Sequence, residues 1–299
     1  MTADRYFDPW TSKTHLTFTV LERYESLESP FQTVEVFKAA DFGTVLSLGG
    51  VTNVTDKDES GYHEMLAHVP LLCHPNPKRV LIIGGGDGGT LGEVLKHPEV
   101  EEAYLVDIDA EVIRVSRKYF PRLAASMDHP KAKVIVGDGL AFVEEAAGRG
   151  EHFDVILVDS TDPVDAAVEL FTEKFYRHCA ALLGEGGILV PQSDSPVFYM
   201  DRVKHVVDTL GGIYKHTNLY LGQVVAYPGG YWAYTLASQS VNPAELKLDP
   251  ARVAALGEEL RYFNGDLFRA CFALPNYVRH GLKGTRPNDM AMIGDNLCR

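Results

Sequence analysis

The sequence predicts an α/β protein in which a doubly wound parallel sheet follows a small N-terminal domain of antiparallel β-strands. From Lys78 onward, short segments rich in Val and Ile alternate with helical segments. These strand segments lack polar alternation, as expected for strands buried on both faces of a parallel sheet. Before Thr55, "FQTVEVFKA" instead alternates apolar and polar residues, and "DFG" and "LGG" are turn signals.

We therefore expect an N-terminal β-strand domain over residues 1–56 and a larger α/β domain over residues 57–299. The stretch "DESGYHEMLAHVPLL" predicts a helix that leads into the first strand. The expected strands are, in order, "RVLIIG", "EAYLVDI", "AKVIVGD", "FDVILVDS" and "GGILVPQ". The expected helices lie around Thr90–Leu95, Ala110–Tyr119, Leu140–Ala147 and Thr172–Leu183. A further helix follows Val197, then strands at Ile213–Tyr220 and Tyr231–Ala237, and C-terminal helical segments that pack back on the sheet.

The composition restricts the class of partner. The chain has 299 residues, 45% of them hydrophobic, and a net charge of −13. This charge argues against nucleic acid or an anionic membrane as partner and suits a cationic ligand, although acidic enzymes are also common for reasons of solubility.

The sequence also predicts a cytoplasmic location. Four cysteines are far apart and form no CxxC pair, which fits reduced thiols: Cys73, Cys179, Cys271 and Cys298. The N-terminus lacks the pattern of a signal peptide, and no apolar stretch is long enough to span a bilayer.

Acidic residues follow four of the expected parallel strands. Ligands of such sheets bind beyond the carboxyl ends of the strands. None of these four strand ends carries Lys or Arg, and the acids there are Asp87 in "GGGDGG", Asp107 and Asp109 in "VDID", Asp138 in "GDG", and Asp159 and Asp162 in "VDSTDP". Scattered surface acids would not select one edge of the sheet four times.

Each of these motifs alone has a structural alternative. The glycine turn occurs in many folds simply as a tight strand–helix connection. Asp107 follows it at about the spacing of twenty residues at which an acid takes ribose hydroxyls. Asp138 is also suited to capping the next helix, and Asp162 before Pro163 is a common turn arrangement.

Together, the acids predict a nucleoside ligand that carries positive charge instead of phosphate. S-adenosylmethionine and its decarboxylated form both fit, because each has a ribose, an adenine and a sulfonium. The Asp87 carboxylate would repel the α-carboxylate of S-adenosylmethionine and attract the bare ammonium of the decarboxylated form.

The segment "HEMLAH" resembles a zinc protease signature, which needs histidines four residues apart on one helical face. His63 and His68 are five residues apart, about 140° around a helix. We therefore expect no metal site.

Five separate segments of the sequence resemble a known family. The segments "SPFQTVEVF", "YHEMLAHVPL", "GGGDGG", "VDSTDP" and "YFNGDLFRACFALPNYV" resemble the polyamine aminopropyltransferases, most closely the spermidine synthases, from about Phe31 to His280. The resemblance implies a Rossmann-like, methyltransferase-type catalytic domain and a homodimer or homotetramer. It also implies transfer of the aminopropyl group of decarboxylated S-adenosylmethionine, a co-substrate rather than a bound cofactor, to a diamine.

The resemblance assigns roles to individual residues. It implies that Asp159 is the proton acceptor, with Tyr62 helping to orient the attacking amine. The donor-binding residues that it implies are Gln32, Asp87, Asp107, Asp138 and Gly139, and the acceptor-binding residues are His63, Asp87, Asp159, Asp162 and Tyr227.

The sequence departs from the family pattern around the expected acceptor site. "LGG" replaces "LDG" at Leu48–Gly50, Asn53 replaces a glutamine, and "QSDSPVF" lacks an aromatic residue after its proline. In "DPVDAAVE", where the family has "DPxGPAE", Asp165 and Ala166 replace Gly and Pro, and Val168 replaces Glu. We expect the loop from Pro163 to Glu169 to cover the amine site. Putrescine is the expected acceptor, with a longer or substituted amine next. The same motifs leave open a small-molecule methyltransferase and a non-catalytic polyamine-binding protein.

Overall fold

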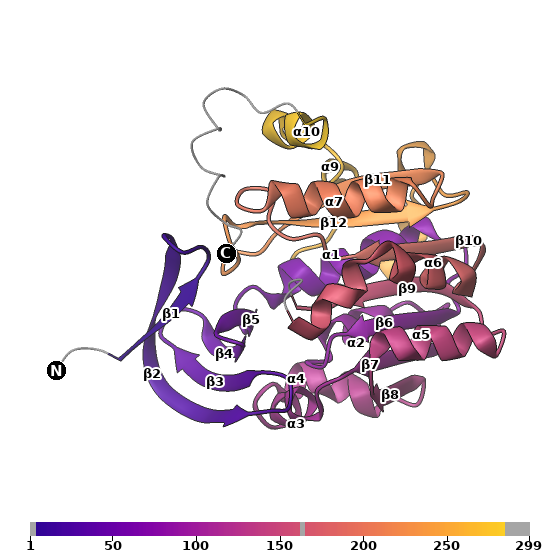
Figure 1. Cartoon of the computed structure of the whole chain (residues 1–299). Helices are drawn as coiled ribbons and strands as arrows, with labels where there is room; N and C mark the ends of the chain where they lie inside the picture. The colour runs from indigo at the N-terminus through magenta and orange to yellow at the C-terminus, as the bar shows by residue number, and fades with distance from the viewer. Residues whose placement is uncertain (1–3, 162–164, 285–299) are drawn as a thin grey trace.

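Two β-sheets organise the computed structural model, which describes residues 4–161 and 165–284 (Figure 1). The first is an antiparallel sheet in which neighbouring strands are also neighbours in sequence. Its strands are β1 (Arg5–Pro9), β2 (His15–Glu28), β3 (Thr33–Ala39), β4 (Gly43–Leu48) and β5 (Val51–Thr55). The expected hairpin of a few strands is therefore a five-stranded sheet.

The second sheet has seven strands in the order β11-β12-β10-β9-β6-β7-β8. The five strands from β10 to β8 are parallel, and β12 pairs antiparallel with both β10 and β11. The strands are β6 (Arg79–Gly84), β7 (Glu102–Asp107), β8 (Ala132–Val136), β9 (Phe153–Asp159), β10 (Leu183–Pro191), β11 (His216–Gln223) and β12 (Tyr231–Ser238). The chain order reverses between β6 and β9, which is where doubly wound sheets bind ligands.

Helices cover both faces of this sheet (Figure 1). Successive β6 residues point to opposite faces, so Val80 and Ile82 join a core on one face of the sheet, while Leu81 and Ile83 join a core on the other. The longer helices are α1 (Glu59–Cys73), α2 (Gly89–Leu95), α3 (Ala110–Tyr119), α5 (Gly139–Gly148), α6 (Glu173–Leu182) and α7 (Met200–Gly211). The shorter ones are α4 (Pro121–Ala124), η1 (Ala125–Asp128), η2 (Asp165–Phe171), η3 (Pro243–Glu245), α8 (Pro250–Ala255), α9 (Gly265–Ala270) and α10 (Asn276–Leu282).

A third core joins the two sheets. Val34, Val36 and Leu46 of the antiparallel sheet pack with Val112 and Phe120, which lie on and just after α3. Figure 1 accordingly shows β3 beside α3 and α4. This packing brings the β4–β5 hairpin toward the carboxyl ends of β6 and β7, where the glycine turn begins. The division into domains at residue 56 stays a prediction.

Most of the expected elements are present. The helix expected over Ala110–Tyr119 has these bounds, because Asp109 caps its start and Pro121 follows its end. The strand expected at Ile213–Tyr220 begins later, at His216, because Ile213 and Tyr214 close the turn after α7 through backbone bonds to Leu210. The C-terminal helices pack back on the sheet through residues such as Phe268 and Cys271.

Candidate active site

A cavity of about 480 Å³ lies at the carboxyl ends of the parallel strands, under the β4–β5 hairpin. It gathers nearly all the residues that the sequence singled out, namely Gln32, Tyr62, His63, Asp87, Asp107, Asp138, Gly139, Asp159 and Tyr227. Asp162 lies outside the described residues, as do Pro163 and Val164.

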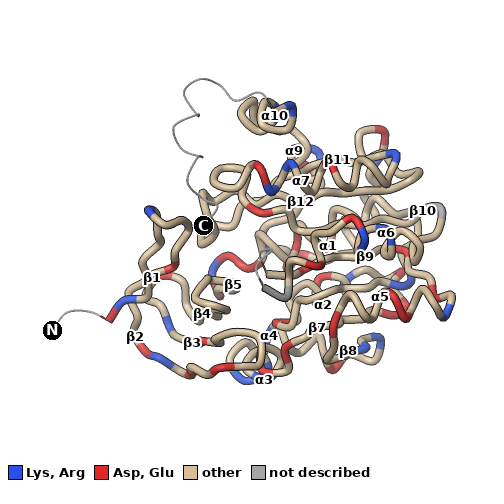
Figure 2. The backbone as a smooth tube through the Cα atoms, viewed as in Figure 1, with Lys and Arg blue, Asp and Glu red and all other residues tan. Residues whose placement is uncertain are grey.

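Apart from one histidine, the charged side chains among the described residues that line this cavity are all carboxylates. Five carboxylates line it, those of Asp87, Asp107, Asp138, Asp159 and Glu169, whereas none of its described lining residues is Lys or Arg. Elsewhere the charges are mixed: acidic and basic residues alternate along β2 and the helices near it (Figure 2). For example, Glu25 pairs with Arg114 and Lys118. The cavity therefore suits a ligand with several positive charges.

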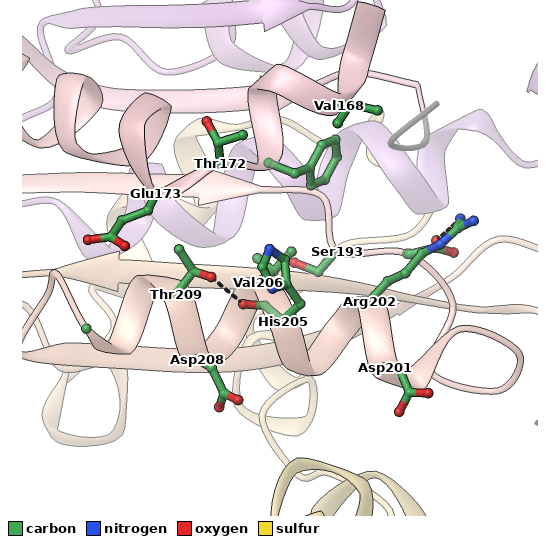
Figure 3. Close-up of a pocket in the computed structure, with 13 residues that line it drawn as sticks. Val168, Thr172, Glu173, Ser193, Asp201, Arg202, His205, Val206, Asp208 and Thr209 are labelled. Atoms are coloured by element: carbon green, nitrogen blue, oxygen red, sulfur yellow. Dashed lines mark hydrogen bonds and ion pairs between the residues drawn. The ribbon is translucent and has the colours of Figure 1, made fainter. Parts of the chain in front are cut away.

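A second cavity is larger, about 710 Å³, and lies between η2 and α7. Val168 and Thr172 face His205 and Val206 across it (Figure 3). Its lining includes Arg202, which pairs with Asp194 at 2.9 Å. None of the strand-end acids named above lines it, so we take the smaller cavity as the candidate active site despite its size.

The glycine turn after β6 makes room for the functional side chains. A Cβ on Gly86 would lie 2.6 Å from the Oδ2 of Asp107, and one on Gly89 would lie 2.2 Å from the His63 ring. Both separations are far below van der Waals contact, so any side chain here would displace the carboxylate or the imidazole.

Asp107 and Gln32 both line the cavity. The Oδ2 of Asp107 accepts a hydrogen bond from the Gly86 N–H, and its Oδ1 accepts one from the Asp109 N–H, each at 2.8 Å. Burial raises the pKa of Asp107 to about 6, although these two hydrogen bonds oppose the shift. Gln32 reaches the same corner by donating to the Oδ2 of Asp109 at 3.1 Å.

Asp138 has the capping role that its motif allowed. Its Oδ1 accepts hydrogen bonds from the N–H groups of Leu140 at 2.8 Å and Ala141 at 3.2 Å, and so caps α5. No described residue donates to its other oxygen, so capping leaves that oxygen available to the cavity. Gly139 follows at the first position of α5, where a Cβ would lie 2.4 Å from Ile83.

Asp159 and Tyr62 both line the cavity and interact with each other. Thr90 donates to the Oδ2 of Asp159 at 2.6 Å, and the Tyr62 hydroxyl also hydrogen-bonds this carboxylate. Burial and then the charge of Asp87 raise the pKa of Asp159 to about 6, against the opposing effects of His63 and of the two hydrogen bonds. Burial also keeps the pKa of Tyr62 well above its usual value, so its hydroxyl remains a donor.

Asp87 is held from two sides. Its Oδ1 accepts the Gly89 N–H at 2.7 Å and lies 3.2 Å from the Nε2 of His63. The Nδ1 of His63 in turn lies 2.8 Å from the Oε2 of Glu59. Both ring nitrogens of His63 therefore face carboxylates.

The two histidines of "HEMLAH" belong to separate networks. His68 contacts Glu93 through Nε2 and His97 through Nδ1, each at 3.0 Å, whereas His63 lines the cavity. Burial, and then the charge of His68, hold the pKa of His97 well below its usual value. Within the described parts of the chain, no group of three His, Cys, Asp or Glu is placed to hold a metal ion.

Comparison with known proteins decides the family. A model described as "Spermine/spermidine synthase domain" matches residues 59–248, and one described as "Spermidine synthase tetramerisation domain" matches residues 17–56. The chain belongs to the spermine/spermidine synthase family. The predicted family and its enzymatic character are thereby confirmed.

Relatives in this family match nearly end to end. The chain is 42% identical over 267 residues to a polyamine aminopropyltransferase from Caldicellulosiruptor bescii, covering 89% of this chain and 94% of the relative. It is 41% identical over 279 residues to one from Thermotoga maritima, covering 93% of each.

Two solved structures of spermidine synthases confirm the predicted Rossmann-like fold class. One, in complex with the transition-state analogue AdoDATO, has a TM-score of 0.91 at 39% identity and covers 95% of this chain and 97% of its own. The other, from Thermotoga maritima, has a TM-score of 0.87 at 39% identity, with 95% of both chains covered.

Within residues 4–161 and 165–284, none of the helices has the length and apolar character needed to cross a membrane.

Some of the positions at which this chain departs from the family pattern line the active-site cavity, and others do not. Gly49 and Asn53 line it, as expected for positions near the acceptor. Val168 instead lines the second cavity, and its neighbour Glu169 lines the active-site cavity. The carboxylate expected to be lost from this segment is therefore offset by one at the next position.

The sequence-based prediction missed several cavity residues. Trp232 lines the cavity beside Tyr227, with ring centroids 4.7 Å apart, and Tyr227 packs on Tyr62 at 5.8 Å. Gln192 also lines it, directly after β10, where the strand-end rule applied to a fifth strand would have found it. No local signal identified Trp232, because the antiparallel pairing of β11 with β12 brings it to the cavity.

Proposed function

We propose that the chain transfers the aminopropyl group of decarboxylated S-adenosylmethionine to putrescine, which gives spermidine and methylthioadenosine. One observation carries this proposal: five carboxylates and no Lys or Arg among the described residues line a single cavity. A sulfonium and the ammonium groups of donor and acceptor supply the positive charges that such a cavity needs. The nucleoside is a co-substrate in this proposal, and no resident cofactor is required.

The donor is assigned to the end of the cavity near the glycine turn. Asp107 would accept hydrogen bonds from the ribose hydroxyls, since each of its oxygens has a lone pair beyond the one used by a backbone N–H. Asp138 and Gly139 would contact the adenine, and Gln32 would contact the nucleoside from the start of β3. Asp87 would bind the ammonium of the aminopropyl group.

The chemical step is an in-line displacement. A neutral amine nitrogen attacks the methylene group next to the sulfonium, the new C–N bond forms, and the C–S electron pair leaves with the neutral thioether. The attacking nitrogen loses one proton, which Asp159 would accept while Tyr62 orients the amine. A pKa of about 6 leaves Asp159 ionised at neutral pH and able to act as a base. Positioning of the two substrates lowers the activation free energy by up to a further ~7–11 kcal/mol.

The acceptor is assigned to the part of the cavity near Asp159. Tyr227 and Trp232 offer aromatic faces to the aliphatic chain and the far ammonium of a diamine. Asp162 keeps its proposed role as an amine contact. Asp87 would also contact the acceptor, and His63 would act on the acceptor through Asp87, because its two ring nitrogens already face carboxylates.

The assembly and location are also proposals. The match of residues 17–56 to a tetramerisation domain supports a homodimer or homotetramer. A cytoplasmic location, in which the buried Cys73, Cys179 and Cys271 stay reduced, remains the proposed one. An N-terminal domain over residues 1–56 and a catalytic domain over 57–299 complete the proposal.

The test incubates the purified protein with decarboxylated S-adenosylmethionine and a panel of amines and identifies products by mass. We expect spermidine and methylthioadenosine from putrescine. Product only with longer or substituted amines would change the acceptor. Methylated product from S-adenosylmethionine would support a methyltransferase, and amine binding without methylthioadenosine release would support a binding protein.

A further inference from the structure

The start of α1 carries a buried carboxylate that has no role in the reaction described above. We propose that Glu59 is a positioning residue, which holds His63 as a charged imidazolium so that His63 fixes Asp87 in the cavity. The proposal rests on the proposed function only in taking Asp87 as the carboxylate that binds a substrate ammonium.

The contacts form a continuous row. Glu59 and His63 are four residues apart on α1, so their side chains lie on one face of the helix. The two side chains are each only 3% exposed, with Nδ1 at 2.8 Å from the Oε2 of Glu59 and Nε2 at 3.2 Å from the Oδ1 of Asp87. An imidazole satisfies carboxylates at both nitrogens only when both carry hydrogen. The geometry therefore selects the imidazolium.

Two arginines balance the buried charge of Glu59. Arg122 of α4 and Arg261 of the segment before α9 both contact its Oε1, the latter at 3.0 Å. Burial opposes ionisation of Glu59, but His63 and the Arg122 guanidinium outweigh it and hold its pKa at about 2. Burial also opposes the charge on His63, but Asp87 and Glu59 hold its pKa well above the usual value.

These contacts hold one carboxylate oxygen of Asp87 and leave the other without a protein partner among the described residues. Oδ1 accepts a hydrogen bond from the Gly89 N–H and lies 3.2 Å from the Nε2 of His63, whereas no described residue donates to Oδ2. Oδ2 is therefore the oxygen available to a substrate ammonium. If Glu59 lost its charge, a neutral His63 would have a single N–H. That proton would lie either on Nε2, toward Asp87, or on Nδ1, and the Nδ1 tautomer would leave the lone pair of Nε2 facing Asp87.

The experiment uses Glu59→Gln in the full-length protein. We expect kcat/KM to fall about 10- to 100-fold, as when the partner that orients a metal-binding histidine is removed. We also expect a pH effect, because the pKa of His63 falls when one of its carboxylate partners is lost. The groups that face His63 are Glu59 on its own helix, Asp87 of the glycine turn and Asp159 of β9. As the pH rises through the lowered pKa, His63 loses its proton and activity is lost, at a lower pH than in the wild type.

Glu64→Gln is the matched control. Glu64 lies on the same helix and is also buried, but it accepts hydrogen bonds from the backbone N–H groups of Arg261, Tyr262 and Phe263. We expect this variant to lose stability and to keep the pH profile of the wild type. A shift of the profile in Glu64→Gln equal to that in Glu59→Gln would overturn the proposal.

A double-mutant cycle with His63→Gln separates positioning from folding. A neutral amide at position 63 donates to Asp87 whatever the charge of residue 59, so Glu59→Gln should cost little in that background. An equal cost in both backgrounds would mean that Glu59 only supports the fold through Arg122 and Arg261.

Nitrogen NMR of His63 across pH gives a readout independent of turnover, with His63→Gln used to assign its signal. We expect an imidazolium throughout the neutral range in the wild type and a titrating ring in Glu59→Gln. An unchanged ring charge in the variant would sink the proposal. If the wild type transferred no aminopropyl group, the proposed function would fail while this titration still decided the role of Glu59.

Discussion

The carboxylates of Asp87 and Asp159 lie in one cavity, and after burial the charge of Asp87 is the largest influence that raises the pKa of Asp159 to about 6. The two residues therefore have linked tasks. A group that binds a cationic substrate also tunes the basicity of the group assigned to take the proton. When a cationic substrate binds between them, it weakens this repulsion.

The first prediction concerns Asp159. Asp159→Asn should lower kcat by ~10²–10⁴, the usual effect of removing a general base, and should leave methylthioadenosine binding intact. Single-turnover kinetics and calorimetry measure the two effects separately. A variant with near-normal turnover would show that another group accepts the proton.

The second prediction concerns the choice of donor. The wild type should bind decarboxylated S-adenosylmethionine much more tightly than S-adenosylmethionine, because Asp87 attracts the ammonium of the first and repels the carboxylate of the second. Asp87→Asn should reduce the difference in affinity between the two nucleosides. Calorimetry that found equal affinities in the wild type would contradict the role given to Asp87 and favour a methyltransferase.

The third prediction concerns pH. A carboxylate base must be ionised, so kcat/KM, which reports the free enzyme, should fall as the pH drops through about 6, the pKa of Asp159. Asp87→Asn removes a nearby negative charge, so the pKa of Asp159 and this acidic limb should move down by about one unit. Thr90→Val removes a hydrogen bond to ionised Asp159 and should move the limb up.

The opposite directions in these two variants make the test specific, because the amine substrate and its own titration are the same in every experiment. Shifts of the same sign in Asp87→Asn and Thr90→Val would mean that the limb does not report Asp159.

The fourth prediction concerns Glu169. Glu169 lines the cavity from η2 and is exposed, so Glu169→Gln should raise KM for the acceptor about two- to five-fold, the effect of losing an exposed ion pair. Donor affinity should not change. Val168→Ala is the control, since Val168 lines the other cavity. Equal effects of the two substitutions on KM would argue that the segment acts through its shape.

The sequence predicted well whatever depends on local pattern and on the rules of parallel sheets. The edge that collects Asp87, Asp107, Asp138 and Asp159 could be predicted because parallel strands end on the same side. Of the two contacts of His63, the sequence indicates only the one with Glu59, because the two residues are four apart on a helix. The second contact depends on how α1 packs against the glycine turn, and on a glycine at position 89 that leaves space for the ring.

Pairings between distant segments could not be predicted in the same way. Trp232 reaches the cavity because the β11–β12 hairpin folds over α1, with Tyr234 of the same strand donating to the carbonyl of Tyr62. Asn53 reaches it because β3, β4 and α3 share a core. Such contacts are set by tertiary packing between elements far apart in the sequence, which neither periodicity nor strand ends reveal.

Among the described residues, five carboxylates and a single histidine, His63, line the active-site cavity, so its net charge is negative. This charge affects which ions of the surrounding solution enter the cavity. Before substrates arrive, its potential draws in small monovalent cations, so that binding of an organic polycation is an exchange of counter-ions. Apparent affinity for amines should then decline with ionic strength, since the Debye length shortens to about 8 Å at physiological salt. Potassium in the surrounding solution would thus act as a constant competitor, and the length and spacing of the ammonium groups, rather than charge alone, would select the amine.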